Sequence, residues 1–171
     1  MASAAIKDAL MTFLAGDAGD VRVTVNAEQA ALLAAGSVYE ARAASGPEAR
    51  KANALPLVVE VVHAAERDDL TVVGIGIAEV LHDVDLVIVQ RRKDVAAGAT
   101  QLGSPEKIRR ALVRRYSGVT NLAISVAASL ATFRWARAQV LAVDAEPDVA
   151  EIVRAIVRVT FAFTEALAAN T

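Results

Sequence analysis

The sequence predicts an α+β protein, in which a mostly antiparallel or mixed β-sheet is flanked by two or three helices. Valine-rich runs in the middle and near the C-terminus alternate apolar and polar residues, which is typical of strands. Two other segments repeat apolar residues every three or four positions, which is typical of amphipathic helices. A chain of 171 residues suits one core, so we expect residues 1–171 to form a single domain.

The N-terminal segment predicts a helix followed by a strand. Residues 4–16 carry apolar side chains at helical spacing, and Gly16 ends the pattern. Residues 21–25 alternate valine with Arg22 and Thr24, and this period of two predicts a half-buried strand.

The next stretch is less regular. Asn26 could cap a short helix that ends at Gly36. Residues 38–43 could form a strand, and residues 44–54 lack an apolar period and predict an exposed loop.

The middle of the chain is rich in β-branched residues and predicts three strands. The charged segment from Glu66 to Asp69 predicts a tight connection between the first two. Residues 79–83 predict a second break, although a continuous bent strand would also fit there. The three runs cover residues 55–64, 70–78 and 84–92.

A second helix is predicted for residues 104–118. Ser104 is a good N-terminal cap, Pro105 suits the first helical position, and Gly118 ends the pattern. Residues 121–132 are apolar and fit either a buried helix or an irregular strand.

Two strands are predicted at the C-terminal end. Residues 134–144 alternate regularly, and residues 156–166 place four large apolar side chains on one face, which a helix would scatter. These four are Val157, Val159, Phe161 and Phe163.

The composition limits the possible functions. The net charge of −2 gives no overall attraction to nucleic acid, and the absence of cysteine excludes thiolate chemistry. The apolar runs are shorter than the ~18 residues of a membrane-spanning helix, so we expect no membrane partner and assembly in the cytoplasm.

Possible catalytic motifs are weak. Gly74 and Gly76 lack the third glycine and the following helix of a nucleotide loop, so a bulge or close backbone approach is the better interpretation. His63 near a strand end and His82 in a predicted surface turn have no spacing of an established metal site. No serine lies in a nucleophile elbow, and no carboxylate pair has catalytic spacing. We therefore expect no enzyme, cofactor or metal.

A basic cluster is the clearest candidate for a functional surface. It could bind DNA phosphates, form salt bridges to an acidic neighbour, or be the solvated side of an amphipathic helix. The cluster comprises Arg91, Arg92 and Lys93 after a strand, and Lys107, Arg109, Arg110, Arg114 and Arg115 on the predicted helix.

The order of these elements resembles that of tail terminator (minor tail) proteins of long-tailed bacteriophages. The resemblance rests on LPLVVEVV, on the strands ending in VQRR, on SPEKIRRALVRRY, on RWARAQVLAV and on the closing IVRVTFAFTEA. It implies a non-enzymatic virion subunit that forms a ring, commonly hexameric, at the head-proximal end of the tail tube. Its expected partners are further copies of itself, tail-tube and neck proteins, and DNA that passes through the ring without sequence recognition.

A ring requires one surface to meet a different surface on the next copy. We expect Arg91, Arg92, Lys107, Arg109, Arg110, Arg114 and Arg115 to form one such surface. The acidic segments 66–69 or 145–148 of the neighbour would form the other.

Three alternatives stay open. The sheet could enclose an apolar pocket of a small-molecule-binding or dimerisation domain. The chain could also be a neighbouring head–tail joining or tail-tube protein. An enzyme using His63 or His82 is the third alternative.

Overall fold

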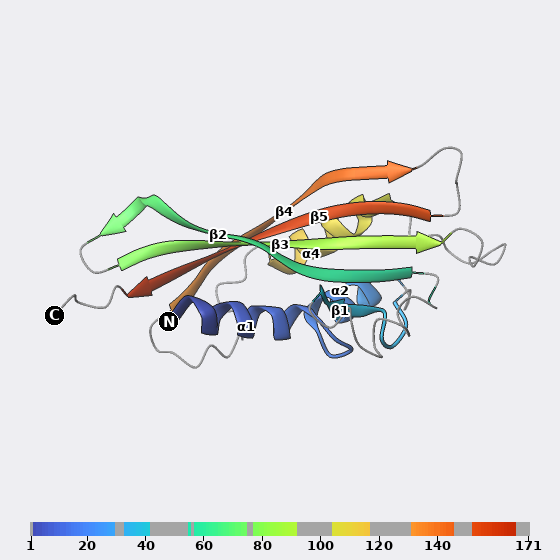
Figure 1. Cartoon of the computed structure of the whole chain (residues 1–171), viewed down its shortest axis with the longest axis horizontal. Coiled ribbons are helices and arrows are strands. Elements are labelled where there is room, and N and C mark those ends of the chain that lie inside the picture. The colour runs from blue at the N-terminus through green and yellow to red at the C-terminus, as the bar shows by residue number, and fades with distance from the viewer. Residues whose placement is uncertain are drawn as a thin grey trace.

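The computed structural model combines one β-sheet with helices, as the sequence predicts. It describes residues 2–29, 33–41, 55, 57–74, 77–91, 104–116, 131–145 and 152–166. Within them, one five-stranded mixed sheet is accompanied by three helices (Figure 1), which confirms the α+β class.

Long antiparallel strands form most of the sheet. Its strand order is β1-β2-β3-β5-β4, with a parallel pairing of β1 to β2 and antiparallel pairings elsewhere. The strands are β1 (Val38–Glu40), β2 (Leu57–Gly74), β3 (Ile77–Arg91), β4 (Ala131–Ala145) and β5 (Ile152–Ala166).

The three helices share one core with one face of the sheet. They are α1 (Ala2–Leu14), α2 (Asp20–Gln29) and α4 (Ser104–Tyr116). Helix side chains such as Leu10 and Leu112 join a single buried cluster with Leu86, Val157 and Phe161 of the strands. Residues paired across an antiparallel sheet share a face, so the register assigns this cluster to one side of the sheet.

Two helices and the C-terminal strands were predicted correctly. Residues 2–14 and 104–116 are helical, and Gly16 follows the first helix with a φ of 83°. Strands β4 and β5 contain the predicted alternating runs. The predicted loop at 44–54 lies outside the described residues, as does all but Ala131 and Thr132 of the ambiguous segment 121–132.

The predicted strand at residues 21–25 is wrong, because these residues belong to α2. Val21 and Val25 are fully buried, whereas Val23 between them is 55% exposed. Residues four apart share a helix face, so the alternating valines also satisfy a helix. Asn26 consequently lies inside α2 and does not begin a helix.

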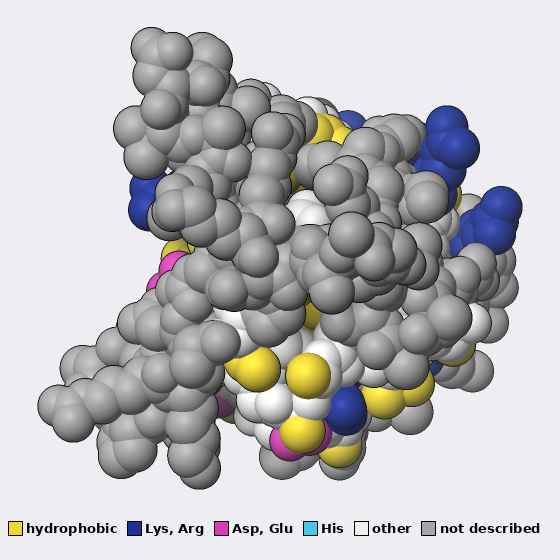
Figure 2. Space-filling model, turned by 90° about the vertical axis from the view of Figure 1, so that its right-hand side faces the viewer, with side chains coloured by type: hydrophobic (Ala, Val, Ile, Leu, Met, Phe, Trp, Pro, Cys, Tyr) yellow, Lys and Arg dark blue, Asp and Glu magenta, His cyan; other side chains and the backbone are white. Residues whose placement is uncertain are grey.

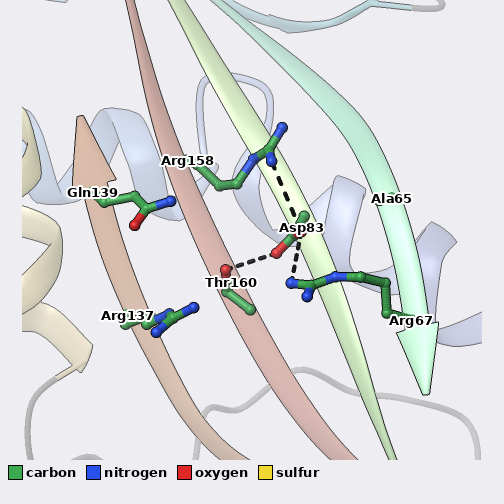
Figure 3. Close-up of a pocket in the computed structure, with 7 residues that line it drawn as sticks. All are labelled: Ala65, Arg67, Asp83, Arg137, Gln139, Arg158 and Thr160. Atoms are coloured by element: carbon green, nitrogen blue, oxygen red, sulfur yellow. Dashed lines mark hydrogen bonds and ion pairs between the residues drawn. The ribbon is translucent and has the colours of Figure 1, made fainter. Parts of the chain in front are cut away.

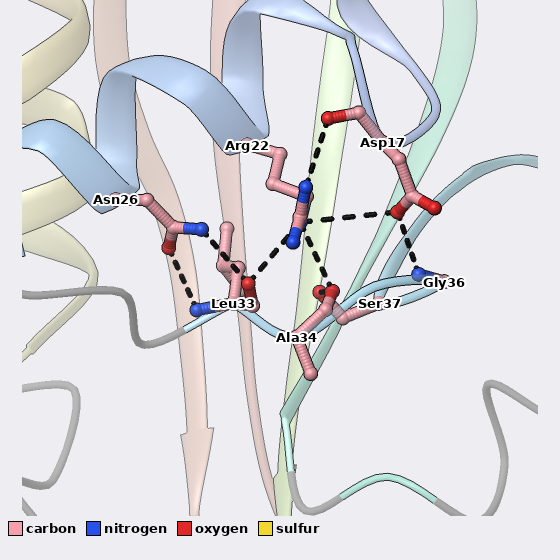
Figure 4. A network of polar contacts seen from close by, with 7 residues as sticks. All are labelled: Asp17, Arg22, Asn26, Leu33, Ala34, Gly36 and Ser37. Atoms are coloured by element: carbon pink, nitrogen blue, oxygen red, sulfur yellow. Dashed lines mark hydrogen bonds and ion pairs between the residues drawn. The ribbon is translucent and has the colours of Figure 1, made fainter.

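Polar contacts fix the connection from α2 to β1 (Figure 4). The Asn26 side chain accepts a hydrogen bond from Leu33 N and donates one to Leu33 O, both at 2.8 Å. Asp17 Oδ1 accepts one from the Gly36 N–H. Gly36 does not end a helix as predicted; it has a φ of 76°, a conformation that favours glycine. Of the predicted strand 38–43, only residues 38–40 are strand, and residues 42 and 43 are not described.

The predicted connection at Glu66 to Asp69 is also wrong, because β2 continues through it to Gly74. Gly74 pairs with Ile77, so the hairpin connection is two residues long. Residues 79–83 likewise lie within a continuous β3, which was the alternative interpretation. Figure 1 shows that this hairpin end extends past the N-terminal end of α1. Charged residues 66–68 are exposed there because solvent surrounds a strand, not because the chain turns.

Candidate functional site

The structure describes part of the predicted basic surface. On α4, Arg110 and Arg114 are exposed, whereas Arg109 is half-buried. Arg91 ends β3 and Lys107 lies on α4, and Arg92 and Lys93 lie outside the described residues. Figure 2 shows one end of the molecule, where Lys and Arg side chains drawn in blue appear in several places, two of them neighbouring at the upper right.

Arg115 has a structural role. Its Nε lies 3.1 Å from Oδ1 of Asp20, the first residue of α2, and the Asp20 side chain is 7% exposed. A carboxylate at this position also interacts favourably with the positive end of the helix dipole. Arg115 therefore joins α4 to α2. We do not include it in the subunit interface that the sequence led us to expect.

A second polar cluster lies on the sheet face opposite the helices (Figure 3). Alternate residues of β2, β3, β5 and β4 point to this face, which we call the open face. Their side chains line a hollow of about 430 Å³ that is open to solvent. The hollow is lined by Ala65, Arg67, Asp83, Arg137, Gln139, Arg158 and Thr160.

Asp83 is the centre of this hollow. Its side chain is only 5% exposed. Oδ1 accepts a hydrogen bond from the Thr160 hydroxyl at 2.7 Å, and Oδ2 accepts one from Arg67 at 2.9 Å. Arg158 lies 4.0 Å from the same carboxylate. A buried carboxylate with several donors has its charge compensated and holds them in place.

Arg158 is held by a second carboxylate. Its Nε and Nη2 donate to the two oxygens of Asp85 at 2.7 and 2.8 Å, a bidentate geometry. This hydrogen bonding raises the pKa of Arg158 above its ordinary value. Arg158 is therefore a fixed cation.

Arg137 and Gln139 form the β4 side of the hollow. They are exposed and extend from β4 toward β5, where their register partners are Thr160 and Arg158. In the part of the chain that the structure describes, neither side chain has a hydrogen-bond or ion-pair partner. Their N–H groups are therefore available to a ligand.

The two histidines form a separate cluster on the helix-covered face. His63 Nε2 and His82 Nδ1 lie 3.1 Å apart, and the His82 ring also stacks edge-on against Phe163. His82 is fully buried in β3, so the predicted surface turn is wrong. The β2–β3 register, which sequence spacing did not reveal, brings the rings together.

Burial lowers the pKa of His82, which favours the neutral form of the ring. Its Nε2 atom is buried and has no hydrogen-bond partner among the described residues. Among the described residues, no group of three His, Asp or Glu side chains could hold a metal ion.

Gly74 lies in the kind of structure expected for a bulge or a close backbone approach, and the described residues around it do not form a nucleotide loop. Gly74 ends β2, and the next described element is strand β3 and not a helix. The backbone register also shifts between Asp69 and Gly74.

Comparisons with known proteins leave the family open. Neither the protein-family models nor the curated proteins searched match this sequence. No helix in the described ranges is long and apolar enough to cross a membrane.

The open-face hollow was missed at the sequence level. Its signal is the polar residue at alternate positions of otherwise apolar strands, as in Asp83, Asp85, Arg158 and Thr160. Identifying the cluster requires the strand register, which pairs Asp83 with Thr160 and Asp85 with Arg158.

Proposed function

We propose that this chain is the tail terminator of a long-tailed bacteriophage, a structural virion subunit without enzymatic activity. Six copies form a ring on the head-proximal end of the tail tube, at the neck. The ring stops tube polymerisation and presents a surface to the neck proteins. DNA passes through it without sequence recognition, and the ring assembles in the host cytoplasm.

The observation that carries this proposal is the difference between the two sides of the sheet. Helices cover one side, whereas the open face carries the ordered charged network around Asp83. A subunit with two unlike sides is suited to a heterologous contact, in which one surface meets a different one on the next copy. Rings form when the rotation between such copies closes.

The order of elements supports the same proposal. The strands that carry the resemblance pair into one sheet, and the capped helix that carries it is α4. On α4, the exposed Arg110 and Arg114 are suited to an acidic surface of the neighbour. Segments 66–69 and 145–148 are the two candidates for that surface.

The direct test is electron microscopy of the purified protein, with and without tail tubes. The proposal predicts isolated rings and tubes of fixed length that each end in a ring. Rings of one subunit type that leave tube length unchanged would favour a head–tail joining protein, and continuous tubes would favour a tail-tube protein. Either result would reject the terminator function.

The basic surface has its own test. We expect a variant with Arg109, Arg110 and Arg114 changed together to Glu to remain monomeric. Arg154→Glu is a matched control, because Arg154 is an exposed arginine on the open face. Circular dichroism must show that the triple variant is folded. Unchanged oligomer mass in a folded triple variant would reject this surface and leave the ring proposal standing.

A further inference from the structure

The open-face hollow has one cation in excess. Three arginines line it or border it, namely Arg67, Arg137 and Arg158, and two carboxylates neutralise two of them, namely Asp83 and Asp85. The arithmetic 3 − 2 leaves a net charge of +1 on the network. Arg137 is the arginine without a carboxylate in the described part of the chain. The hollow is therefore suited to an anionic group, for which a guanidinium provides bidentate donors.

The donors have a defined spacing. Arg137 and Gln139 are two residues apart on β4 with regular pairing to β5, so their side chains leave the same face. At ~3.3 Å per residue, their Cα atoms are about 7 Å apart. A matching ligand presents two acceptors at a similar separation.

The chain itself carries a matching pair of acceptors. Glu66 and Asp68 are exposed and are two residues apart in a regularly paired part of β2. Their spacing is therefore the same, about 7 Å between Cα atoms. Within the described residues, neither carboxylate has a hydrogen-bond or ion-pair partner.

The two pairs cannot meet within one molecule. Glu66 pairs with His82 and Asp68 pairs with Val80, so both carboxylates lie on the helix side of the sheet. The hollow lies on the open face. A contact between them requires two copies, and it joins unlike surfaces, as a ring requires.

We propose that the hollow binds the carboxylates of Glu66 and Asp68 from a second copy of this chain. The projecting end of the β2–β3 hairpin of one copy docks on the open face of the next, with the carboxylates against Arg137 and Gln139. This inference rests on the proposed ring and identifies the partner of the open face. It assigns segment 66–69 to the hollow and leaves segment 145–148 for α4.

Two variants separate the two halves of the contact. Arg137→Glu reverses the charge that the hollow offers to the ligand. Glu66→Lys combined with Asp68→Lys reverses the charges at the end of the hairpin. Each alone is expected to be monomeric by native mass spectrometry. The controls, Arg154→Glu on the open face and Asp8→Lys on α1, change exposed residues outside the contact and are expected to assemble like wild type.

Mixing the two defective variants provides the sharpest result. The unchanged hairpin of one variant then meets the unchanged hollow of the other, and the lysine-bearing hairpin meets the hollow that carries glutamate. The mixture is therefore expected to assemble into closed species in which the two variants alternate. Combining all three substitutions in one chain swaps the charges, and assembly is expected to return. Thermal unfolding of each variant verifies that it is folded.

The outcomes distinguish this inference from the function on which it rests. If folded Arg137→Glu assembles like wild type, or if the mixture stays monomeric, the hollow contact is wrong and the ring proposal stands. If wild type itself never assembles, both fail.

Discussion

His63 on β2 and His82 on β3 lie with Nε2 and Nδ1 3.1 Å apart beneath the helices, where His82 is fully buried. Burial lowers the pKa of His82 below its ordinary value of 6.5, and Lys7 of α1 and His63 act in the same direction. Glu66 and Asp83 oppose this shift. The folded chain therefore favours a neutral His82.

The first prediction concerns acid stability. The unfolded chain binds a proton at His82 more readily than the folded chain does, so stability rises with pH in the interval between the two pKa values. The contribution is complete above about pH 6.5 and is lost as the pH falls from there toward the lowered pKa. His82→Leu removes this dependence. Urea unfolding from pH 5 to 8 measures it, and parallel curves for wild type and variant would contradict the assignment.

The second prediction concerns Asp83. Asp83→Asn weakens charge-assisted hydrogen bonds from Thr160 and Arg67 at a site that is almost buried. We expect the free energy of unfolding to fall by about 2–3 kcal/mol. Urea denaturation measures this loss. The control is Asp8→Asn at an exposed position of α1, which is expected to lie within about 0.5 kcal/mol of wild type. A loss below about 0.5 kcal/mol in Asp83→Asn would show that the network is not ordered in solution.

The third prediction concerns the contact between α2 and α4. Asp20→Asn removes the charge opposite Arg115 and at the start of α2, and is expected to cost about 1 kcal/mol. The Arg115 side chain is 38% exposed, so solvent weakens the pair. A double-mutant cycle with Arg115→Gln is expected to give a coupling of about 0.5–1 kcal/mol. Additive losses would mean that the two side chains do not interact.

The fourth prediction concerns the connection after α2. Asn26→Ala removes two hydrogen bonds of 2.8 Å to the backbone of Leu33 and is expected to cost about 1–2 kcal/mol. The control is Val23→Ala on the exposed side of the same helix, expected within about 0.5 kcal/mol. Thermal unfolding measures both effects. If the two substitutions have equal effects, the hydrogen bonds of Asn26 do not stabilise the fold.

The spacing of apolar residues predicted the secondary structure correctly where it fits either a helix or a strand, but not both. The stripe from Val157 to Phe163 excludes a helix, and it forms the buried face of β5. Residues 21–25 were ambiguous, because Val21 and Val25 are two strand steps apart and also one helical turn apart. In the folded chain these residues form a helix, which buries Val21 and Val25 and places Asn26 where it bonds to Leu33.

Charge was the less reliable signal for turns. Residues 66–69 were interpreted as a connection, yet a strand that projects past the helices is solvated and tolerates the same residues. Because of this error, the end of the first hairpin strand was predicted too early, whereas β2 continues to Gly74. The strand register was therefore missed, which pairs His63 with Val84 and Ala65 with Asp83. Without this register, neither the histidine pair nor the open-face hollow could be predicted.

Self-assembly through two unlike surfaces is the central claim, and native mass spectrometry of the wild-type chain at micromolar concentration tests it most directly. The account predicts one closed species, six copies in a ring. A chain that remains monomeric or forms a symmetric dimer over the whole concentration range would contradict it.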